Sequence, residues 1–129
     1  MDTLFSHVNV VTMNEQMTLW QDAFVGVTDG KIAYMAKKPP EEKPKKIIDA
    51  TGMVLMPGLI NCHTHIYSGL ARGLSIKGCN PTNFLENLEQ QWWKIDDNLT
   101  LDGTKASATA LYIDSIKQGV TTVFDHHAS

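Results

Sequence analysis

The order of sequence patterns after Pro57-Gly58 constrains the fold more than any other feature of this chain. A strand pattern at Leu59 to His65 precedes two helical segments, and a β-branched strand pattern follows them at Val120 to Asp125. The helical patterns cover Pro81 to Ile95 and Leu101 to Gln118. Strand, helical connection and strand in this order are typical of a right-handed crossover between two parallel strands. The pattern therefore predicts an α/β unit in which the strand Leu59 to His65 is buried.

Local signals mark the ends of both helical segments. Asn80 is predicted to cap the first helix, with Pro81 at its first position, because an asparagine side chain can accept a hydrogen bond from a free backbone N–H there. Thr100 is predicted to cap the second helix, and Gly119 is predicted to end it. The helical connection thus stops at a glycine directly before the second strand.

The first 56 residues predict short strands joined by tight turns, which is typical of a meander. The Asp29-Gly30 pair is a two-residue hairpin signal. The segment KKPPEEKPKK, Lys37 to Lys46, contains only charged residues and prolines, so we expect an exposed loop. We place a domain boundary at the Pro57-Gly58 break, so that residues 1–56 belong to one domain and residues 57–129 begin a second. The predicted strands of the first part are Phe5 to Thr12, Ala23 to Thr28, Lys31 to Met35, Ile47 to Asp49 and Met53 to Met56.

Composition and charge exclude several classes of protein. A hydrophobic fraction of 43% in 129 residues is enough for a folded core. The net charge of -3, with basic and acidic residues intermixed, gives no basic patch for nucleic acid. The beginning of the chain has no signal-peptide pattern, and no segment is apolar enough to cross a membrane, so we expect a cytoplasmic protein.

His63-Thr64-His65 is the motif that carries chemistry. Alternate residues of a strand face the same side, so both imidazoles can bind one ion at the end of the predicted strand. Histidine nitrogens bind zinc at about 2.0–2.1 Å, and two ligands on one rigid strand lose little entropy on binding. The spacing therefore makes His63 and His65 candidate metal ligands.

The sequence around this motif, VLMPGLINCHTHIYSGLARG, resembles the amidohydrolase superfamily. The resemblance implies a small β-sandwich built from both ends of the chain, followed by a (β/α)8 TIM barrel that begins here with its first two strands. It also implies that His63 and His65 bind one divalent metal, zinc or alternatively iron. The expected activity is hydrolysis of a non-peptide C–N bond in a small molecule, by deamination or a related aminohydrolase or chlorohydrolase reaction.

Three further segments are most similar to the chlorohydrolase and aminohydrolase branch of that superfamily. These segments are IYSGLARG, FLENLEQQWWKID and TTVFDHHAS, and the last two resemble the aminohydrolase associated with selenium metabolism. Enzymes of this superfamily take further ligands and proton-transfer residues from later strands. We therefore expect an N-terminal fragment that is inactive alone, because a catalytic zinc usually needs three protein ligands.

Four other residues are candidates for the site. Asp125 can orient a ligand histidine through its second ring nitrogen. His126 and His127 follow the second strand, where barrel enzymes bind substrate, and only one of them can face inward. Arg72 follows the metal-binding strand and can bind an anionic group of the substrate. For each of these residues a purely structural role is an open alternative.

Aromatic residues near the motif allow two interpretations. Tyr67 and Trp93 can line a pocket for a planar heterocycle, although aromatic residues at helical spacing are more often part of a core. We expect Trp92 to be a core residue.

Two alternative functions remain open at this stage. A cyclic amidase of the hydantoinase or dihydroorotase type commonly has an arginine two positions after the second histidine, where this chain has Tyr67. A catalytically inert fragment that acts as an assembly module would instead fold cooperatively alone. Whether the parent enzyme is a homo-oligomer is also left open.

Overall fold

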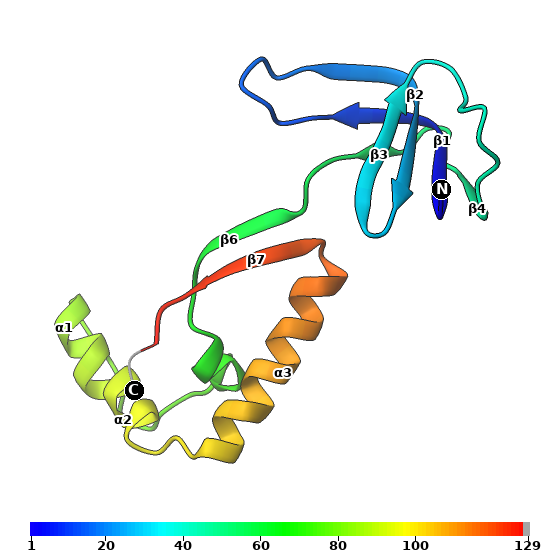
Figure 1. The fold of residues 1–129 in the computed structure, drawn as a ribbon. Coiled ribbons are helices and arrows are strands. Elements are labelled where there is room, and N and C mark those ends of the chain that lie inside the picture. Colours follow the sequence, from blue (N-terminus) through cyan, green and yellow to red (C-terminus); the bar gives the residue numbers. More distant parts are fainter. Residues whose placement is uncertain (128–129) are drawn as a thin grey trace. The chain divides into compact units, whose positions relative to one another are not determined.

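The computed structural model describes residues 1–127 and contains two compact units, Met1–Pro57 and a second unit that begins at Gly58. The first unit is a β-sheet and the second is a mixed α/β unit (Figure 1). Among the described residues, no helix combines the length and the apolar character that a membrane crossing requires.

The first unit is a five-stranded sheet with the strand order β3-β2-β1-β4, in which β5 also pairs with β1. β1, β2 and β3 form the predicted antiparallel meander, whereas β4 and β5 pair with β1 in parallel. Asp29 and Gly30 have φ angles of 50° and 72° between Thr28 and Lys31, which confirms the two-residue hairpin. The strands are β1 (Thr3–Val11), β2 (Leu19–Thr28), β3 (Lys31–Ala36), β4 (Lys46–Asp49) and β5 (Val54–Leu55).

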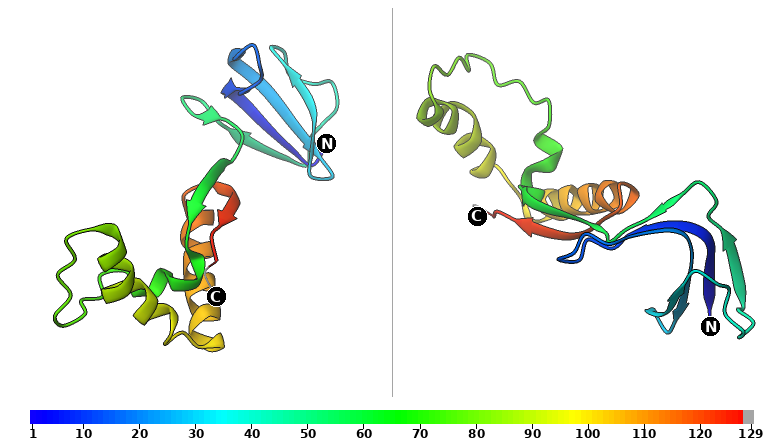
Figure 2. Two further views of the ribbon diagram at one scale, coloured as in Figure 1. Left: turned by 90° about the vertical axis from the view of Figure 1, so that its left-hand side faces the viewer. Right: turned by 90° about the horizontal axis from the view of Figure 1, so that it is seen from above.

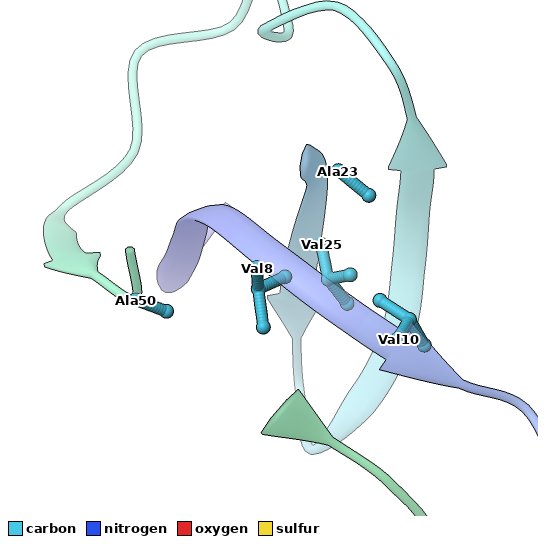
Figure 3. Packing of buried hydrophobic residues seen from close by; sticks show 5 residues of the cluster. All are labelled: Val8, Val10, Ala23, Val25 and Ala50. Carbon is cyan, nitrogen blue, oxygen red and sulfur yellow. The ribbon is translucent and has the colours of Figure 1, made fainter. Parts of the chain in front are cut away.

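Small aliphatic side chains form the core of this sheet (Figure 3). Val8 and Val25 are 1% exposed, because they lie on adjacent paired strands and face the same side. Ala23 and Ala50 lie in the same cluster, and Trp20 packs against its edge. Apolar side chains of the sheet also line a cavity of about 410 Å³, among them Phe5, Val10, Ile32, Met35 and Leu55.

The second unit contains two parallel strands joined by helices, as the sequence predicts. β6 (Leu59–Thr64) pairs in parallel with β7 (Val120–Asp125), and α3 (Leu101–Lys117) leads directly into β7 (Figures 1 and 2). The Thr100 hydroxyl accepts the Gly103 N–H at 3.1 Å, which confirms the predicted cap of α3. Gly119 has a φ of 79°, the left-handed conformation expected of a glycine that ends a helix.

The prediction that β6 is a buried strand is wrong for the part of the chain that the structure describes. Leu59 and Ile60 are 48% and 59% exposed. The strand pairs only with β7 among the described residues, and α3 packs against β7 rather than against β6. One neighbouring strand and no covering helix leave most of its side chains in solvent.

The first helical segment begins later than predicted. Asn83, and not Asn80, caps α1 (Phe84–Asn87), because its side chain accepts the Glu86 N–H at 3.0 Å. The Glu86 carboxylate in turn accepts hydrogen bonds from the N–H and the hydroxyl of Thr82. This reciprocal arrangement satisfies free donors that a start at Pro81 would leave unpaired. Asn80 instead donates its N–H to Gln90.

A wide turn interrupts this helical segment. α1 continues into the π-helix η2 (Leu88–Trp92) and then into α2 (Trp93–Asp96). Trp92 is only partly buried and Trp93 is 48% exposed, so the prediction of Trp92 as a core residue is wrong. π turns are rare and occur often at functional sites, and this one places both indoles on the wall of a cavity.

The segment that follows β6 is held firmly against α3. This segment forms the 3₁₀ helix η1 (Ile66–Ala71), in which Ile66, Tyr67 and Ser68 are buried. Ser107 of α3 is 1% exposed, and its hydroxyl donates to the Ile66 carbonyl oxygen at 2.6 Å. The same hydroxyl oxygen accepts the Leu70 N–H at 3.2 Å. The residues directly after His65 therefore have a fixed place in the unit.

Candidate metal centre

His63 and His65 lie side by side at the carboxyl end of β6. His63 is in the strand, and His65 is the residue that precedes η1. Their Nε2 atoms are 3.3 Å apart, and the two rings meet edge to face with centroids 5.2 Å apart. Two nitrogens that each lie about 2.0–2.1 Å from one tetrahedral zinc are about 3.3 Å apart. The pair therefore has the spacing that a shared zinc ion requires.

The proton on the His65 ring is assigned by His126, the residue that follows β7. His65 Nδ1 lies 2.9 Å from the carbonyl oxygen of His126, and a carbonyl oxygen can only accept a hydrogen bond. Nδ1 therefore carries the proton, and the lone pair of Nε2 faces the Nε2 atom of His63. Metal-binding histidines are commonly held in this way by an acceptor at the second nitrogen.

His126 and His127 occupy different surroundings. The His126 ring lies against the His63 ring, with centroids 4.5 Å apart and an interplanar angle of 40°. The His127 ring lies 4.8 Å from the ring of Tyr67, and its Nδ1 donates to the Asp125 carboxylate at 2.9 Å. His126 is therefore the one of the two that joins the histidine pair.

Asp125 does not contact a ring nitrogen of His63 or His65 in the described structure. One of its carboxylate oxygens accepts the Ile66 N–H at 2.9 Å, and the other accepts from His127. Partial burial raises the pKa of Asp125, but the hydrogen bonds from His127 and Ile66 outweigh this, so the pKa lies below its usual value of 3.8. The carboxylate is ionised at neutral pH.

A cavity of about 520 Å³ opens beside the two histidines. It is lined by His63, His65, Tyr67, Phe84, Leu88, Trp92, Trp93 and Asp96. Its wall is mostly apolar and aromatic, and its volume is in the range of small-molecule sites. Tyr67 and Trp93 line it, as one of the two sequence-based interpretations expects, whereas no signal in the sequence indicated that Leu88 and Trp92 border it as well.

Two polar groups lie among these aromatic residues. Tyr67 is 3% exposed, and burial raises its pKa, with a further increase from the nearby Asp96 carboxylate. The Oδ1 atom of Asp96 is buried without a hydrogen-bond partner among the described residues. Tyr67 thus lies in the pocket wall as a neutral phenol, next to a carboxylate.

Arg72 and His63 line different cavities. It is exposed after η1 and lines a smaller cavity of about 320 Å³, which His65, Gln91 and Trp92 also line. Arg72 does not line the larger cavity, although His65 and Trp92 border both cavities. It shows no ion pair of Arg72 within residues 1–127.

The described residues do not complete a metal site by themselves. Residues 1–127 contain no group of three or more histidine, cysteine or acidic side chains placed to hold one ion. The chemistry of the pair nevertheless fits a divalent metal, since two neutral imidazole nitrogens at this spacing are ordinary zinc ligands. The pair supplies part of a coordination sphere.

These observations define a parallel α/β unit with a histidine pair at the carboxyl end of its first strand. Residues 54–129 match the model of the amidohydrolase family. The chain therefore belongs to the amidohydrolase family.

Curated relatives of the chain include nucleoside deaminases. It is 28% identical over 128 residues to a 5-methylthioadenosine/S-adenosylhomocysteine deaminase of Shouchella clausii, an alignment that covers 97% of this chain and 29% of that protein. It is 30% identical over 124 residues to a 5'-deoxyadenosine deaminase of Methanosarcina mazei, which covers 96% of this chain and 28% of that protein. The chain thus spans less than a third of the length of these relatives.

Solved structures with the same fold include zinc-containing enzymes. The atrazine chlorohydrolase of Arthrobacter aurescens, complexed with zinc, matches with a TM-score of 0.79 and 30% identity over 97% of this chain and 28% of that one. An adenosine deaminase of Xanthomonas campestris with bound zinc matches with the same TM-score and 25% identity, again over 97% and 28%. The arrangement of strands and helices described above is therefore that of amidohydrolases.

Proposed function

We propose that this chain forms the first part of a metal-dependent hydrolase that acts on a non-peptide C–N bond of a small molecule. The observation that carries the proposal is the 3.3 Å separation of the His63 and His65 Nε2 atoms at the end of a parallel strand. Deaminases and a chlorohydrolase among the similar proteins support a reaction of this class. We propose zinc as the metal, with iron as the alternative.

His63 and His65 would hold the metal through their Nε2 atoms. When bound, such a metal lowers the pKa of a coordinated water from about 15.7 toward about 7 and so supplies a nucleophile at neutral pH. The His126 carbonyl oxygen keeps the His65 ring in the tautomer that can bind. The remaining ligands and the proton-transfer residues are proposed to lie outside these 129 residues.

The cavity beside the pair favours a planar heterocyclic or amidine-like substrate. Trp92, Trp93 and Phe84 provide flat apolar surfaces against which such a ring can stack. The His126 ring, which lies against His63, is proposed to contact the substrate near the reacting carbon. His127 and Arg72 are proposed to contact more distant parts of the substrate, from the Tyr67 side and from the smaller cavity respectively.

Two finer assignments accompany this function. The first concerns the fold. β6 and β7 would begin a (β/α)8 barrel. The sheet of residues 1–56 would be one layer of a β-sandwich, and the second layer would cover the apolar cavity of that sheet. The second is membership of the subgroup of the aminohydrolase associated with selenium metabolism. The segment TTVFDHHAS and the Trp92-Trp93 pair support the subgroup.

The test uses the full-length protein that contains this chain. We expect close to one equivalent of zinc or iron per chain by elemental analysis, and ammonia or another leaving group released from a panel of substituted purines, pyrimidines and triazines. The His63→Gln/His65→Gln variant should lose both the metal and the turnover. His7→Gln is the matched control, because His7 belongs to the first unit and pairs with Asp22. A metal-free wild-type protein, or turnover that survives the double substitution, would contradict the proposal.

A further inference from the structure

The carboxylate of Asp125 joins the ends of two neighbouring strands. Asp125 is the last residue of β7 and lies opposite Thr64, the last residue of β6. One carboxylate oxygen accepts the N–H of Ile66 at 2.9 Å, and the other accepts the Nδ1–H of His127 at 2.9 Å. Ile66 directly follows His65. A side chain of one strand therefore holds the main chain of the other at the point where the candidate ligands lie.

Two further hydrogen bonds fix the same point. The His126 N–H donates to the Thr64 carbonyl oxygen at 2.9 Å, and the His126 carbonyl oxygen accepts from His65 Nδ1 at 2.9 Å. The residues before, at and after His65 thus each have one bond to the end of β7. Of these three, only the bond of Asp125 to Ile66 uses a side chain from β7, so only this one can be removed by a single substitution that leaves the candidate ligand His65 unchanged.

Regular strand pairing does not supply this last bond. The register between β6 and β7 is already irregular between Asn61 and Thr64, and the chain turns into η1 after His65. The Ile66 N–H lies beyond the ladder and needs another acceptor. Asp125, which is ionised and only 25% exposed at its side chain, provides a charged acceptor for it.

We propose that Asp125 is a positioning residue for the metal ligand His65 and acts through the main chain rather than through the imidazole. By holding Ile66, it fixes the direction in which the chain leaves β6, and this keeps the His65 ring on the His126 carbonyl with Nε2 facing His63. The inference rests on the proposed function. It differs from the sequence-based expectation that Asp125 contacts a ring nitrogen directly.

The two oxygens of Asp125 allow this role to be separated from its contact with His127. Asp125→Ala removes both hydrogen bonds. Asp125→Asn retains an amide oxygen for the Ile66 N–H, and its NH₂ group can still bond to the other tautomer of His127. His127→Ala removes only the second contact. If Asp125 acts through Ile66, Asp125→Ala should weaken metal binding. Asp125→Asn and His127→Ala should largely preserve it.

The experiment measures zinc dissociation constants of the full-length protein by competition with a chromophoric chelator, at a temperature where circular dichroism shows each metal-free variant to be folded. We expect Asp125→Ala to raise the Kd by about 10–100-fold, the range typical of partners that support a ligand. Asp125→Asn and His127→Ala should each change it less than about tenfold. If Asp125→Ala does not fold, Asp125→Ser replaces it, since its short hydroxyl cannot reach both partners.

Two results would overturn the positioning role. One is an Asp125→Ala or Asp125→Ser protein whose zinc Kd stays within the tenfold limit, and the other is a His127→Ala protein that loses as much affinity as Asp125→Ala. A zinc Kd of Asp125→Asn that stays close to wild type distinguishes the positioning role from a general loss of structure, which the asparagine would not prevent. A wild-type protein that binds no metal would instead contradict the proposed function, so the two failures are distinguishable.

Discussion

The hydroxyl of Ser107 donates a hydrogen bond to the carbonyl oxygen of Ile66, 2.6 Å away, although the two residues are 41 positions apart in the sequence. The bond ties the buried face of α3 to the residue that follows His65. The contribution of this hydrogen bond to the free energy of unfolding can therefore be measured independently of any metal.

Ser107→Ala should destabilise the protein by about 1–3 kcal/mol, because it leaves the buried Ile66 carbonyl and the Leu70 N–H without their partner. Urea unfolding followed by circular dichroism measures the loss. Thr109→Ala on the same helix is the matched control, since Thr109 is exposed and its hydroxyl bonds only to Lys105 of its own helix. The control should cost no more than about 0.5 kcal/mol. An equal loss of unfolding free energy in the two variants would show that the Ser107 hydrogen bonds contribute no more to stability than the Thr109 hydrogen bond does.

Gly69→Ala should destabilise the second unit by about 1–3 kcal/mol, because a Cβ at this position would lie 2.1 Å from Cδ1 and 2.5 Å from Cγ of Leu111. The side chain of Leu111 would have to move away from η1. In the Gly69→Ala/Leu111→Ala variant, the clash is absent, so the double substitution should cost less than the sum of the two single ones. Additive losses in this double-mutant cycle would argue against close packing of η1 on α3.

His126→Ala should change the zinc Kd of the full-length protein by less than about tenfold, because the main-chain carbonyl that accepts from His65 survives the substitution. The same variant should raise KM, since the His126 ring lies against His63 at the proposed reacting end of the cavity. Chelator competition and steady-state kinetics measure the two effects separately. A much larger loss of zinc affinity would mean that the His126 ring is itself a ligand.

Glu86 should contribute a pH-dependent stabilisation to the start of α1. The Thr82 backbone N–H is the largest cause that lowers the pKa of Glu86 below its usual 4.5, and the Thr82 hydroxyl adds to it. A carboxylate with a lowered folded-state pKa stabilises the fold at pH values above its unfolded pKa, and the contribution is lost as the pH falls through the folded pKa. The difference in thermal midpoint between wild type and Glu86→Gln should therefore shrink between about pH 6 and pH 3. A difference that is constant over this range would rule out the charged cap.

Much of the fold follows from local sequence signals. The Asp29-Gly30 hairpin, the Thr100 cap and the Gly119 helix end each depend on residues within one turn of the chain, and the structure has all three. The prediction of where the first helical segment begins was wrong, because Asn80 and Asn83 offer the same kind of capping side chain. Glu86, three residues after Asn83, distinguishes them, because its carboxylate accepts the Thr82 N–H and so completes the cap of a helix that begins at Phe84.

The candidate site was predicted only in part for a different reason. The spacing of His63 and His65 is a local feature, so the sequence indicates the pair. The acceptor for the His65 ring is a main-chain carbonyl 61 positions later, and any residue at position 126 has one. The role of Asp125 depends likewise on the register of two strands, which no single-residue signal reports.

The π turn of η2 makes the shape of the cavity depend on the length of a segment as well as on its residues. Neighbouring positions of an ordinary α-helix point about 100° apart, so two adjacent indoles would normally diverge. Trp92 ends the wider turn and Trp93 begins α2, yet both border the same hollow. Deleting one residue from Leu88 to Trp92 would tighten the coil and swing one indole outward. A family member could thus acquire room for a bulkier ring by losing a single codon.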